Sequence, residues 1–235
     1  MNPRIISNPQ NLQVLYEDNH LIAVNKRPGD IVQGDKTGDQ PLSEIIKEYI
    51  ARKYNKPGKV YLGVVHRLDR PTSGIILFAR TSKATARLNQ LFQEKKIKKT
   101  YWAIVEGSVS LESTTLTHYL VRNPKQNKSY AHDKKVPNSK LAILHFQVVQ
   151  KLQKYTLLEI HLETGRHHQI RSQLSKLNHV IKGDLKYGAK RSNPDGSICL
   201  HARSVEFTHP VKNEPILIKS PLPLDPIWDY CKKKA

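Results

Sequence analysis

The most informative part of the sequence is His66-Arg67-Leu68-Asp69-Arg70-Pro71-Thr72-Ser73-Gly74, and the continuous apolar run of residues 75–79 follows it directly. A short apolar run of this kind is typical of a strand that is buried on both faces. The polar stretch before it is then a loop whose position is fixed by the core while its side chains can face a cleft. The sequence thus predicts a functional loop anchored on a buried strand.

Asp69 is the candidate catalytic residue of this loop. Arg67 and Arg70 flank it, and nearby guanidinium charge keeps a carboxylate ionised, as a nucleophile or a base requires. Pro71 restricts Arg70 to extended conformations, and Gly74 permits a tight turn or the close approach of a substrate backbone. On the local pattern alone, a surface turn in which Asp69 pairs with a neighbouring arginine is at least as good an interpretation.

A second cluster of functional side chains, formed by Arg166, His168 and Arg171, follows a glycine turn. It stands at the start of a helix that we expect to run from about residue 168 to 177. Helix N-termini attract anions, and two arginines there can hold a phosphate or a catalytic carboxylate. An amphipathic helix with an ordinary basic face is the alternative interpretation.

The charge balance points to a polyanionic partner. The chain has 39 Lys and Arg against 20 Asp and Glu, a net charge of +19, which favours RNA or DNA binding over a basic surface kept for solubility. Residues 95–140 hold ten of these cations and three acids, with Tyr101, Trp102, Tyr119 and Tyr130 interspersed. This segment fits an RNA-facing surface and a solvated loop about equally.

The sequence gives little support for a membrane-binding segment or for paired cysteines. No convincing basic amphipathic helix and no apolar run of membrane-spanning length occurs, so no membrane partner is predicted. Cys199 and Cys231 are the only cysteines and form no CxxC pair. We therefore expect the protein to work in the reducing cytoplasm.

Patterns of apolar residues predict short strands that alternate with a few helices. The expected strands cover residues 12–17, 21–25, 75–79, 100–106, 114–121, 141–150, 154–163, 205–208 and 216–218. The expected helices begin near Pro41, after Ser82 as the N-cap, and near His168. This order is typical of an α+β fold with a mixed, largely antiparallel sheet and flanking helices.

Other chemistries fit the sequence poorly. Residues 66–69 differ in spacing from a kinase catalytic loop, and no GxGxxG or DFG element accompanies them. Residues 161–163 match half of the zinc deaminase signature, but the PCxxC half is absent. The histidines have no accepted ligand spacing, so no metal site is predicted. A glycosidase needs two cooperating carboxylates, and Glu163 is the only obvious partner near a motif.

Five short motifs together resemble one family. Residues 66–74 closely resemble the HRLDxxTSG motif of the RluA family of pseudouridine synthases, and residues 165–171 are similar to its GRTHQIR motif. Weaker matches, in family order, are the KPxG turn at residues 26–29, the YxA strand at 99–103 and the LHAxxLxFxHP element at 200–210. The matches span roughly residues 12–222. The chain departs from the family pattern at Gln33, where His is frequent, and at His167, where Thr is usual.

The resemblance implies a pseudouridine synthase fold with a central active-site cleft, and roles for individual residues. Asp69 matches the nucleophilic carboxylate, Tyr101 the tyrosine that packs on the base and assists deprotonation at C5, and Arg171 the arginine that pairs with the catalytic Asp. Arg67 matches the arginine that fills the gap left by the flipped-out uridine. No cofactor is expected, because isomerisation involves no net redox change. Further RNA contacts are expected from the basic or polar residues Lys26, Arg70, Arg166 and His168.

We expect residues 1–11 to be an N-terminal extension, 12–225 to be the catalytic domain, and 226–235 to be a basic C-terminal tail. The expected partner is a stem-loop of ribosomal or transfer RNA, and the expected state is a monomer without an obligate protein partner. An RNA-binding or assembly protein that keeps the fold but has lost turnover is the alternative function. The intact set of Asp69, Tyr101 and Arg171 argues against it.

Overall fold

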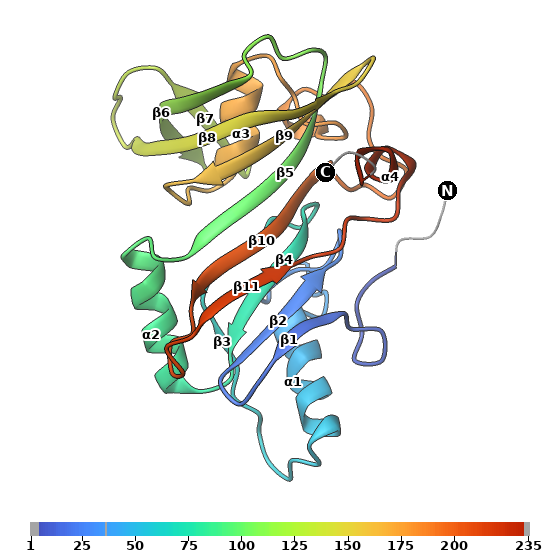
Figure 1. The fold of residues 1–235 in the computed structure, drawn as a ribbon, viewed down its shortest axis with the longest axis vertical. Helices are drawn as coiled ribbons and strands as arrows, with labels where there is room; N and C mark the ends of the chain where they lie inside the picture. Colours follow the sequence, from blue (N-terminus) through green and yellow to red (C-terminus); the bar gives the residue numbers. More distant parts are fainter. Residues whose placement is uncertain (1–4, 36, 233–235) are drawn as a thin grey trace. The chain divides into compact units, whose positions relative to one another are not determined.

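The computed structural model describes residues 5–35 and 37–232 and contains two units. The first unit comprises residues 1–99 and 202–221, and the second comprises residues 100–201 and 222–235. Each unit is built on antiparallel strand pairs with helices against them (Figure 1). The predicted α+β fold with a largely antiparallel sheet is confirmed.

The first unit is built on a sheet with the strand order β1-β2-β4-β10. Its elements are β1 (Val14–Glu17), β2 (Leu21–Lys26), α1 (Leu42–Lys53), β3 (Gly63–Val64), β4 (Ser73–Ala79), α2 (Ser82–Gln93), β10 (Leu200–Thr208) and β11 (Pro215–Lys219). Strand β3 pairs with β4, and β11 pairs with β10. Residues 200–201 of β10 belong to the second unit.

Every residue of β4 is buried because each face of the strand meets a different core cluster. Ile76 and Phe78 pack in the cluster that contains Leu42 and Ile46 of α1. The alternate residues Ile75, Leu77 and Ala79 pack in the cluster that contains Ala84 and Leu88 of α2. Each such aliphatic side chain contributes roughly 1.5–3 kcal/mol on burial, so this strand is a firm anchor for the loop before it. The predicted buried strand is confirmed.

The start of α2 and the N-terminal segment differ from the expectation. The N-cap of α2 is Thr81, whose Oγ1 accepts from the amide of Ala84 at 3.1 Å, so the prediction of Ser82 as cap was wrong.

Ser7 is buried, and its hydroxyl donates to Asp30 Oδ2 at 2.6 Å. Residue 7 of the expected extension is therefore part of the packed first unit, whereas residues 1–4 lie outside the described residues.

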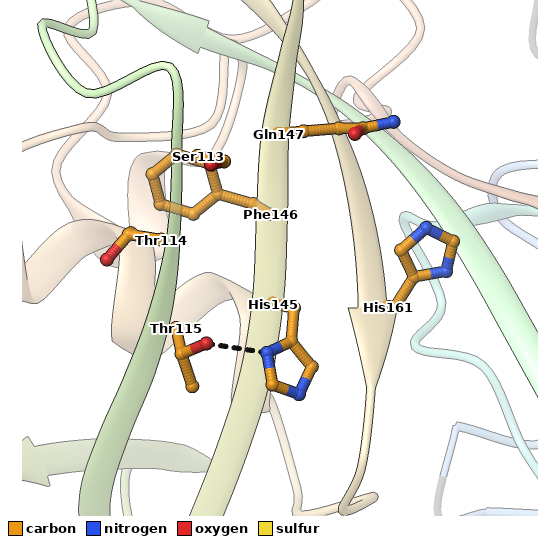
Figure 2. Close-up of a pocket in the computed structure, with 7 residues that line it drawn as sticks. All are labelled: Ser113, Thr114, Thr115, His145, Phe146, Gln147 and His161. Carbon is orange, nitrogen blue, oxygen red and sulfur yellow. Dashed lines mark hydrogen bonds between the residues drawn. The ribbon is translucent and has the colours of Figure 1, made fainter.

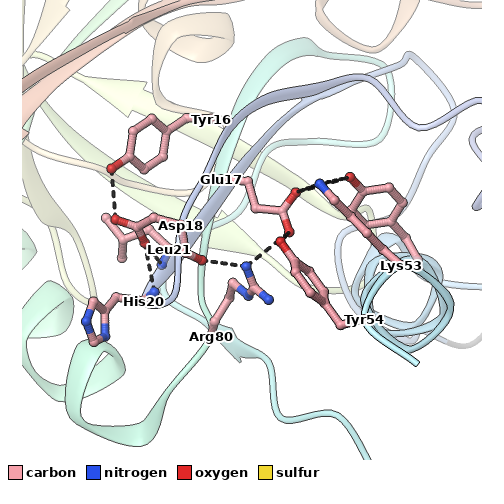
Figure 3. A network of polar contacts seen from close by, with 9 residues as sticks. Tyr16, Glu17, Asp18, His20, Leu21, Lys53, Tyr54 and Arg80 are labelled. Atoms are coloured by element: carbon pink, nitrogen blue, oxygen red, sulfur yellow. Dashed lines mark hydrogen bonds and ion pairs between the residues drawn. The ribbon is translucent and has the colours of Figure 1, made fainter. Parts of the chain in front are cut away.

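A polar network joins β1 to α1 and to the residue after β4 (Figure 3). The carboxylate of Glu17 accepts from Lys53 Nζ at 2.7 Å, Tyr54 Oη at 2.9 Å and Arg80 Nη1 at 3.0 Å. Burial favours the neutral carboxyl, but the hydrogen bonds from Lys53, Tyr54 and Tyr49 outweigh it and lower the pKa of Glu17. The ionised Glu17 carboxylate therefore joins β1 to Lys53 and Tyr54 at the end of α1 and to Arg80.

The second unit is a sheet with the order β5-β9-β8-β6-β7. Its elements are β5 (Lys98–Glu106), β6 (Ser113–Asn123), β7 (Lys128–His132), β8 (Lys140–Lys151), β9 (Tyr155–Leu162), α3 (Gln169–Lys176), the 3₁₀ helix η1 (Leu185–Tyr187) and α4 (Pro226–Lys232). All four pairings in this order are antiparallel. Helix α3 lies against β6 and β7.

Three elements of this unit were not predicted, namely β7, η1 and α4. Strand β7 lacks apolar alternation, and it forms by pairing with β6 after a turn in which Asn127 has φ 46°. Helix α4 replaces most of the expected basic tail, because Trp228 and Cys231 are buried. Residues 233–235 of that tail lie outside the described residues. Within residues 5–35 and 37–232, no helix is long and apolar enough to cross a membrane.

Candidate functional site

The loop that carries Asp69 is held by one buried ammonium group. Lys26 is completely buried, and its Nζ donates to the carbonyl oxygens of Arg27 at 3.0 Å, Arg70 at 3.0 Å and Thr72 at 2.7 Å. The amide of Thr72 closes a turn onto the carbonyl of Asp69 at 3.0 Å. Because buried donors and acceptors must be paired, these bonds fix the backbone on the C-terminal side of Asp69.

This placement contradicts the prediction of Lys26 as an RNA contact. A lysine without exposed surface, whose ammonium binds main-chain carbonyls, cannot meet a phosphate from solution. The sequence showed its positive charge but not its burial. Lys26 therefore supports the loop instead of binding the substrate.

Gly74 is required where the loop enters β4. Its φ is +108°, and a Cβ atom there would lie 2.3 Å from the carbonyl oxygen of Ala202. Any side chain would therefore clash with backbone as well as strain its own conformation. The predicted close approach involves a neighbouring strand of the protein's own sheet.

His66 also has a supporting position. Its Nε2 accepts from the amide of Leu77 in β4 at 2.9 Å. Burial, together with the nearby charge of Lys99, lowers the pKa of His66 to about 3. The imidazole is therefore neutral at physiological pH and acts as an acceptor for the backbone.

The charged side chains of the loop are accessible. Arg67 is exposed, and Asp69 and Arg70 are partly exposed. Arg70 forms an ion pair with Asp39. Asp69, Arg67 and Arg70 thus share one loop, on which the Asp69 carboxylate is partly exposed.

Arg171 is held by a residue that sequence analysis missed. It is only 4% exposed, and its guanidinium forms a bidentate pair with Asp184, with Nε–Oδ2 at 2.7 Å and Nη2–Oδ1 at 2.8 Å. Asp184 is 1% exposed. The available signal was a single acid, flanked by Gly183, in the strongly basic stretch of residues 182–191.

Tyr187 links the start of α3 to the β6–β7 hairpin. Its hydroxyl lies 3.0 Å from Nδ1 of His168, accepts from the amide of Ser129 at 2.8 Å and donates to the carbonyl of Ser129 at 3.1 Å. Its ring lies 5.0 Å from the guanidinium carbon of Arg171. Tyr187 and Asp184 therefore bracket Arg171 from the two ends of η1.

His168 is mostly buried at the start of α3. It is 8% exposed, takes a left-handed backbone conformation with φ 52° as the N-cap of α3, and stacks on His167 with ring centroids 3.8 Å apart. An RNA contact at His168 stays a prediction. Arg166, by contrast, is exposed, and its Nε donates to the carbonyl of Leu141 at 2.9 Å.

The aromatic residues of segment 95–140 do not form one surface. Tyr101 is 7% exposed on β5, where it pairs in register with Ile160. Trp102 is 6% exposed, and its Nε1 donates to Glu159 Oε2 at 3.1 Å. Tyr130 is 40% exposed. Trp102 is therefore packed within the protein, whereas Tyr130 is accessible.

An open hollow of about 290 Å³ lies on the second unit (Figure 2). It is lined by Ser113, Thr114, Thr115, His145, Phe146, Gln147 and His161. His145 bonds to Thr115 Oγ1 through Nδ1 and to Glu163 Oε1 through Nε2, both at 2.6 Å. The predicted catalytic residues do not line this hollow. Within residues 5–35 and 37–232, no group of three or more His, Cys, Asp or Glu side chains could hold a metal ion.

Comparison with known proteins identifies the family. The pattern of the RNA pseudouridylate synthase family matches residues 20–176. The chain is 36% identical to the ribosomal large subunit pseudouridine synthase C of Buchnera aphidicola, over 90% of this chain and 67% of that protein. It is 31% identical to the tRNA pseudouridine synthase C of Salmonella typhi, over 92% and 87%.

The fold also matches a solved structure. Human RNA pseudouridylate synthase domain containing 4 superimposes with a TM-score of 0.75 at 22% identity, over 90% of this chain and 89% of that one. This likeness concerns the fold alone. Together with the sequence relatives it leads to one conclusion: the chain belongs to the RluA family of RNA pseudouridylate synthases.

Proposed function

We propose that this protein is an RNA pseudouridine synthase that isomerises a uridine in structured ribosomal or transfer RNA. The observation that carries the proposal is the partly exposed carboxylate of Asp69, on a loop fixed by Lys26 and anchored on the buried strand β4. Its relatives include enzymes named for large-subunit ribosomal RNA and for tRNA. The net charge of +19 suits a polyanionic substrate.

In the proposed reaction, Asp69 is the nucleophile: its carboxylate forms a bond to the ribose or to the base, and this bond breaks again before the product is released. The bond between N1 of the uracil and C1′ of the ribose breaks, the base rotates, and a bond forms between C5 and C1′. The proton at C5 leaves and N1 gains one, so the product is an isomer of the substrate. Tyr101 packs on the base and assists removal of the proton at C5, and Arg171 stabilises the charge of Asp69.

The uridine must leave the RNA helix before it reacts. A stacked and paired base cannot expose its glycosidic bond to a side chain, so the enzyme extrudes the nucleotide. We propose that Arg67, which is exposed on the same loop as Asp69, occupies the space that the base leaves. Arg70 and Arg166 contact neighbouring phosphates. The proposed working state is a monomer in the cytoplasm that requires no cofactor.

The test measures product and binding separately. RNA from a strain that lacks the gene is incubated with the wild-type protein or with Asp69→Asn, and pseudouridine is quantified by mass labelling. We expect product from the wild type and none from Asp69→Asn, with nearly equal RNA affinities, because phosphate contacts supply most of the binding energy. A wild-type protein that binds this RNA without forming pseudouridine would fit the alternative of a non-catalytic RNA-binding protein.

A further inference from the structure

We infer that the open face of the β6–β7 hairpin is a stacking platform for unpaired bases of the RNA substrate. The platform consists of Tyr119, Tyr130 and His132, with Val121 beside them. The inference rests on the proposed function, because it concerns the same RNA substrate. It assigns a role to one part of the basic segment 95–140.

The strand register places these side chains on one face. Leu116, His118 and Leu120 of β6 are buried, and Nδ1 of His118 lies 3.0 Å from Gln173 Nε2 of α3. Because side chains alternate along a strand, Tyr119 and Val121 point away from α3. Residues directly opposite share a face, and the cross-strand pairs are Tyr119 with His132 and Val121 with Tyr130.

The platform is accessible and has the spacing that bases need. Tyr130 is 40% exposed, and Leu141, which pairs with Tyr119, is 39% exposed. Tyr130 and His132 are two residues apart on β7, a separation of about 6–7 Å along the strand. Unstacked bases can be held by aromatic rings on such a sheet face.

The charge around the platform fits a nucleic acid. Residues 122–135 contain five Lys or Arg and one acid, Asp133. The carboxylate of Asp133 is paired with Lys176 of α3 at 3.0 Å, so it does not cancel the field of the exposed lysines. Lys128 Nζ lies 5.3 Å from the centroid of the Tyr130 ring. A base that stacks beside this ring therefore brings its phosphate toward a cation.

The hairpin is also ordered before any ligand arrives. His167 binds the hairpin at its turn, with Nδ1 2.9 Å from Ser129 Oγ and Nε2 3.1 Å from Asn127 Oδ1. Lys186 Nζ donates to the carbonyl of Asn127 at 3.1 Å. A surface that is already rigid loses little conformational entropy on binding. These bonds distinguish the hairpin from a loose, solvated basic loop.

The experiment measures binding of a short single-stranded oligouridylate to the full chain by fluorescence anisotropy, with a duplex of the same length in parallel. The variants are Tyr130→Ala and Tyr130→Phe, and the matched control is Tyr230→Ala, which removes a tyrosine that is 58% exposed on α4. We expect Tyr130→Ala to weaken single-strand binding about tenfold, since stacking on one ring is lost. Tyr130→Phe keeps the ring and Tyr230→Ala lies outside the platform, so both should bind as the wild type does.

Three results would overturn the inference. These are wild-type affinity in Tyr130→Ala, an equal loss for the duplex, or an equal loss in Tyr130→Phe, which would assign the effect to the hydroxyl that bonds to Gln126. The proposed enzyme activity is judged by a different readout. If the wild type forms product and Tyr130→Ala binds the oligouridylate with wild-type affinity, only the platform is excluded. If binding depends on the Tyr130 ring but the wild type forms no product, only the enzyme proposal is excluded.

Discussion

Arg171 and Asp184 form a buried bidentate ion pair in the second unit, through Nε–Oδ2 at 2.7 Å and Nη2–Oδ1 at 2.8 Å. Two parallel bonds fix both the position and the plane of the guanidinium. Nε and Nη2 both bond to Asp184, so the direction in which Nη1 points is fixed as well. Asp184 is in this way a positioning residue for Arg171.

Asp184→Asn should reduce both stability and turnover. The substitution breaks a buried bidentate ion pair, which costs about 3–5 kcal/mol of unfolding free energy. Urea denaturation and pseudouridine formation check the two effects. The double variant Arg171→Met/Asp184→Leu should recover much of the stability but none of the activity. The control Glu94→Gln removes an exposed carboxylate and should change neither stability nor turnover. Wild-type stability and turnover in Asp184→Asn would contradict the role of Asp184 as a positioning residue for Arg171.

Lys26→Met should disturb the Asp69 loop more than it disturbs RNA affinity. The substitution leaves the carbonyl oxygens of Arg27, Arg70 and Thr72 without their shared donor. Each charged hydrogen bond of this kind is worth roughly 1.5–3 kcal/mol, so we expect a loss of several kcal/mol and faster amide exchange at Thr72. Lys56→Met, at an exposed lysine, is the control. A selective loss of RNA affinity with normal stability would instead restore Lys26 as an RNA contact.

His66 should make the free energy of unfolding depend on pH. The unfolded chain binds a proton on this histidine near its ordinary pKa of 6.5, whereas burial, with the charge of Lys99, lowers the folded pKa to about 3. As the pH falls between these values, the unfolded state takes up a proton that the folded state excludes, so stability present above pH 6.5 is lost. His66→Gln keeps an acceptor for the Leu77 amide but does not titrate. Urea denaturation at several pH values should therefore show a flatter profile for His66→Gln.

His167→Thr, which introduces the residue usual in the family motif, should loosen the hairpin. A threonine is too short to reach both Ser129 and Asn127, so the bonds at 2.9 Å and 3.1 Å are lost. We expect faster hydrogen exchange at the amides of residues 127–130 and weaker oligouridylate binding, with the global unfolding free energy reduced by only about 1 kcal/mol. His161→Thr, on β9, is the control. Unchanged exchange in the hairpin would show that other contacts hold it.

The buried framework could be predicted because its signal is local. The apolar run of residues 75–79 has both faces covered, and that pattern is visible in the sequence without knowledge of its partners. Strand β7 depends on pairing with β6, which its own residues do not encode. Helix α4 was not predicted because its segment is basic in composition and only two of its residues, Trp228 and Cys231, are buried among the described ones.

The site was predicted in part, for a related reason. Motif spacing located Asp69 and Arg171, but it could not show which charged groups are buried. Lys26 was assigned to RNA on its chemistry, but its complete burial gives it a supporting position. Asp184 became visible only when the chain folded and brought it within hydrogen-bond distance of Arg171.

The bonds of Lys26 have a consequence for how the family can diversify. The lysine holds main-chain oxygens, which are the same whatever side chains stand at positions 70 and 72. A substitution at the partly exposed position 70 can therefore change the surface of this loop without moving the backbone next to Asp69. The backbone of the loop and its exposed side chains can evolve separately.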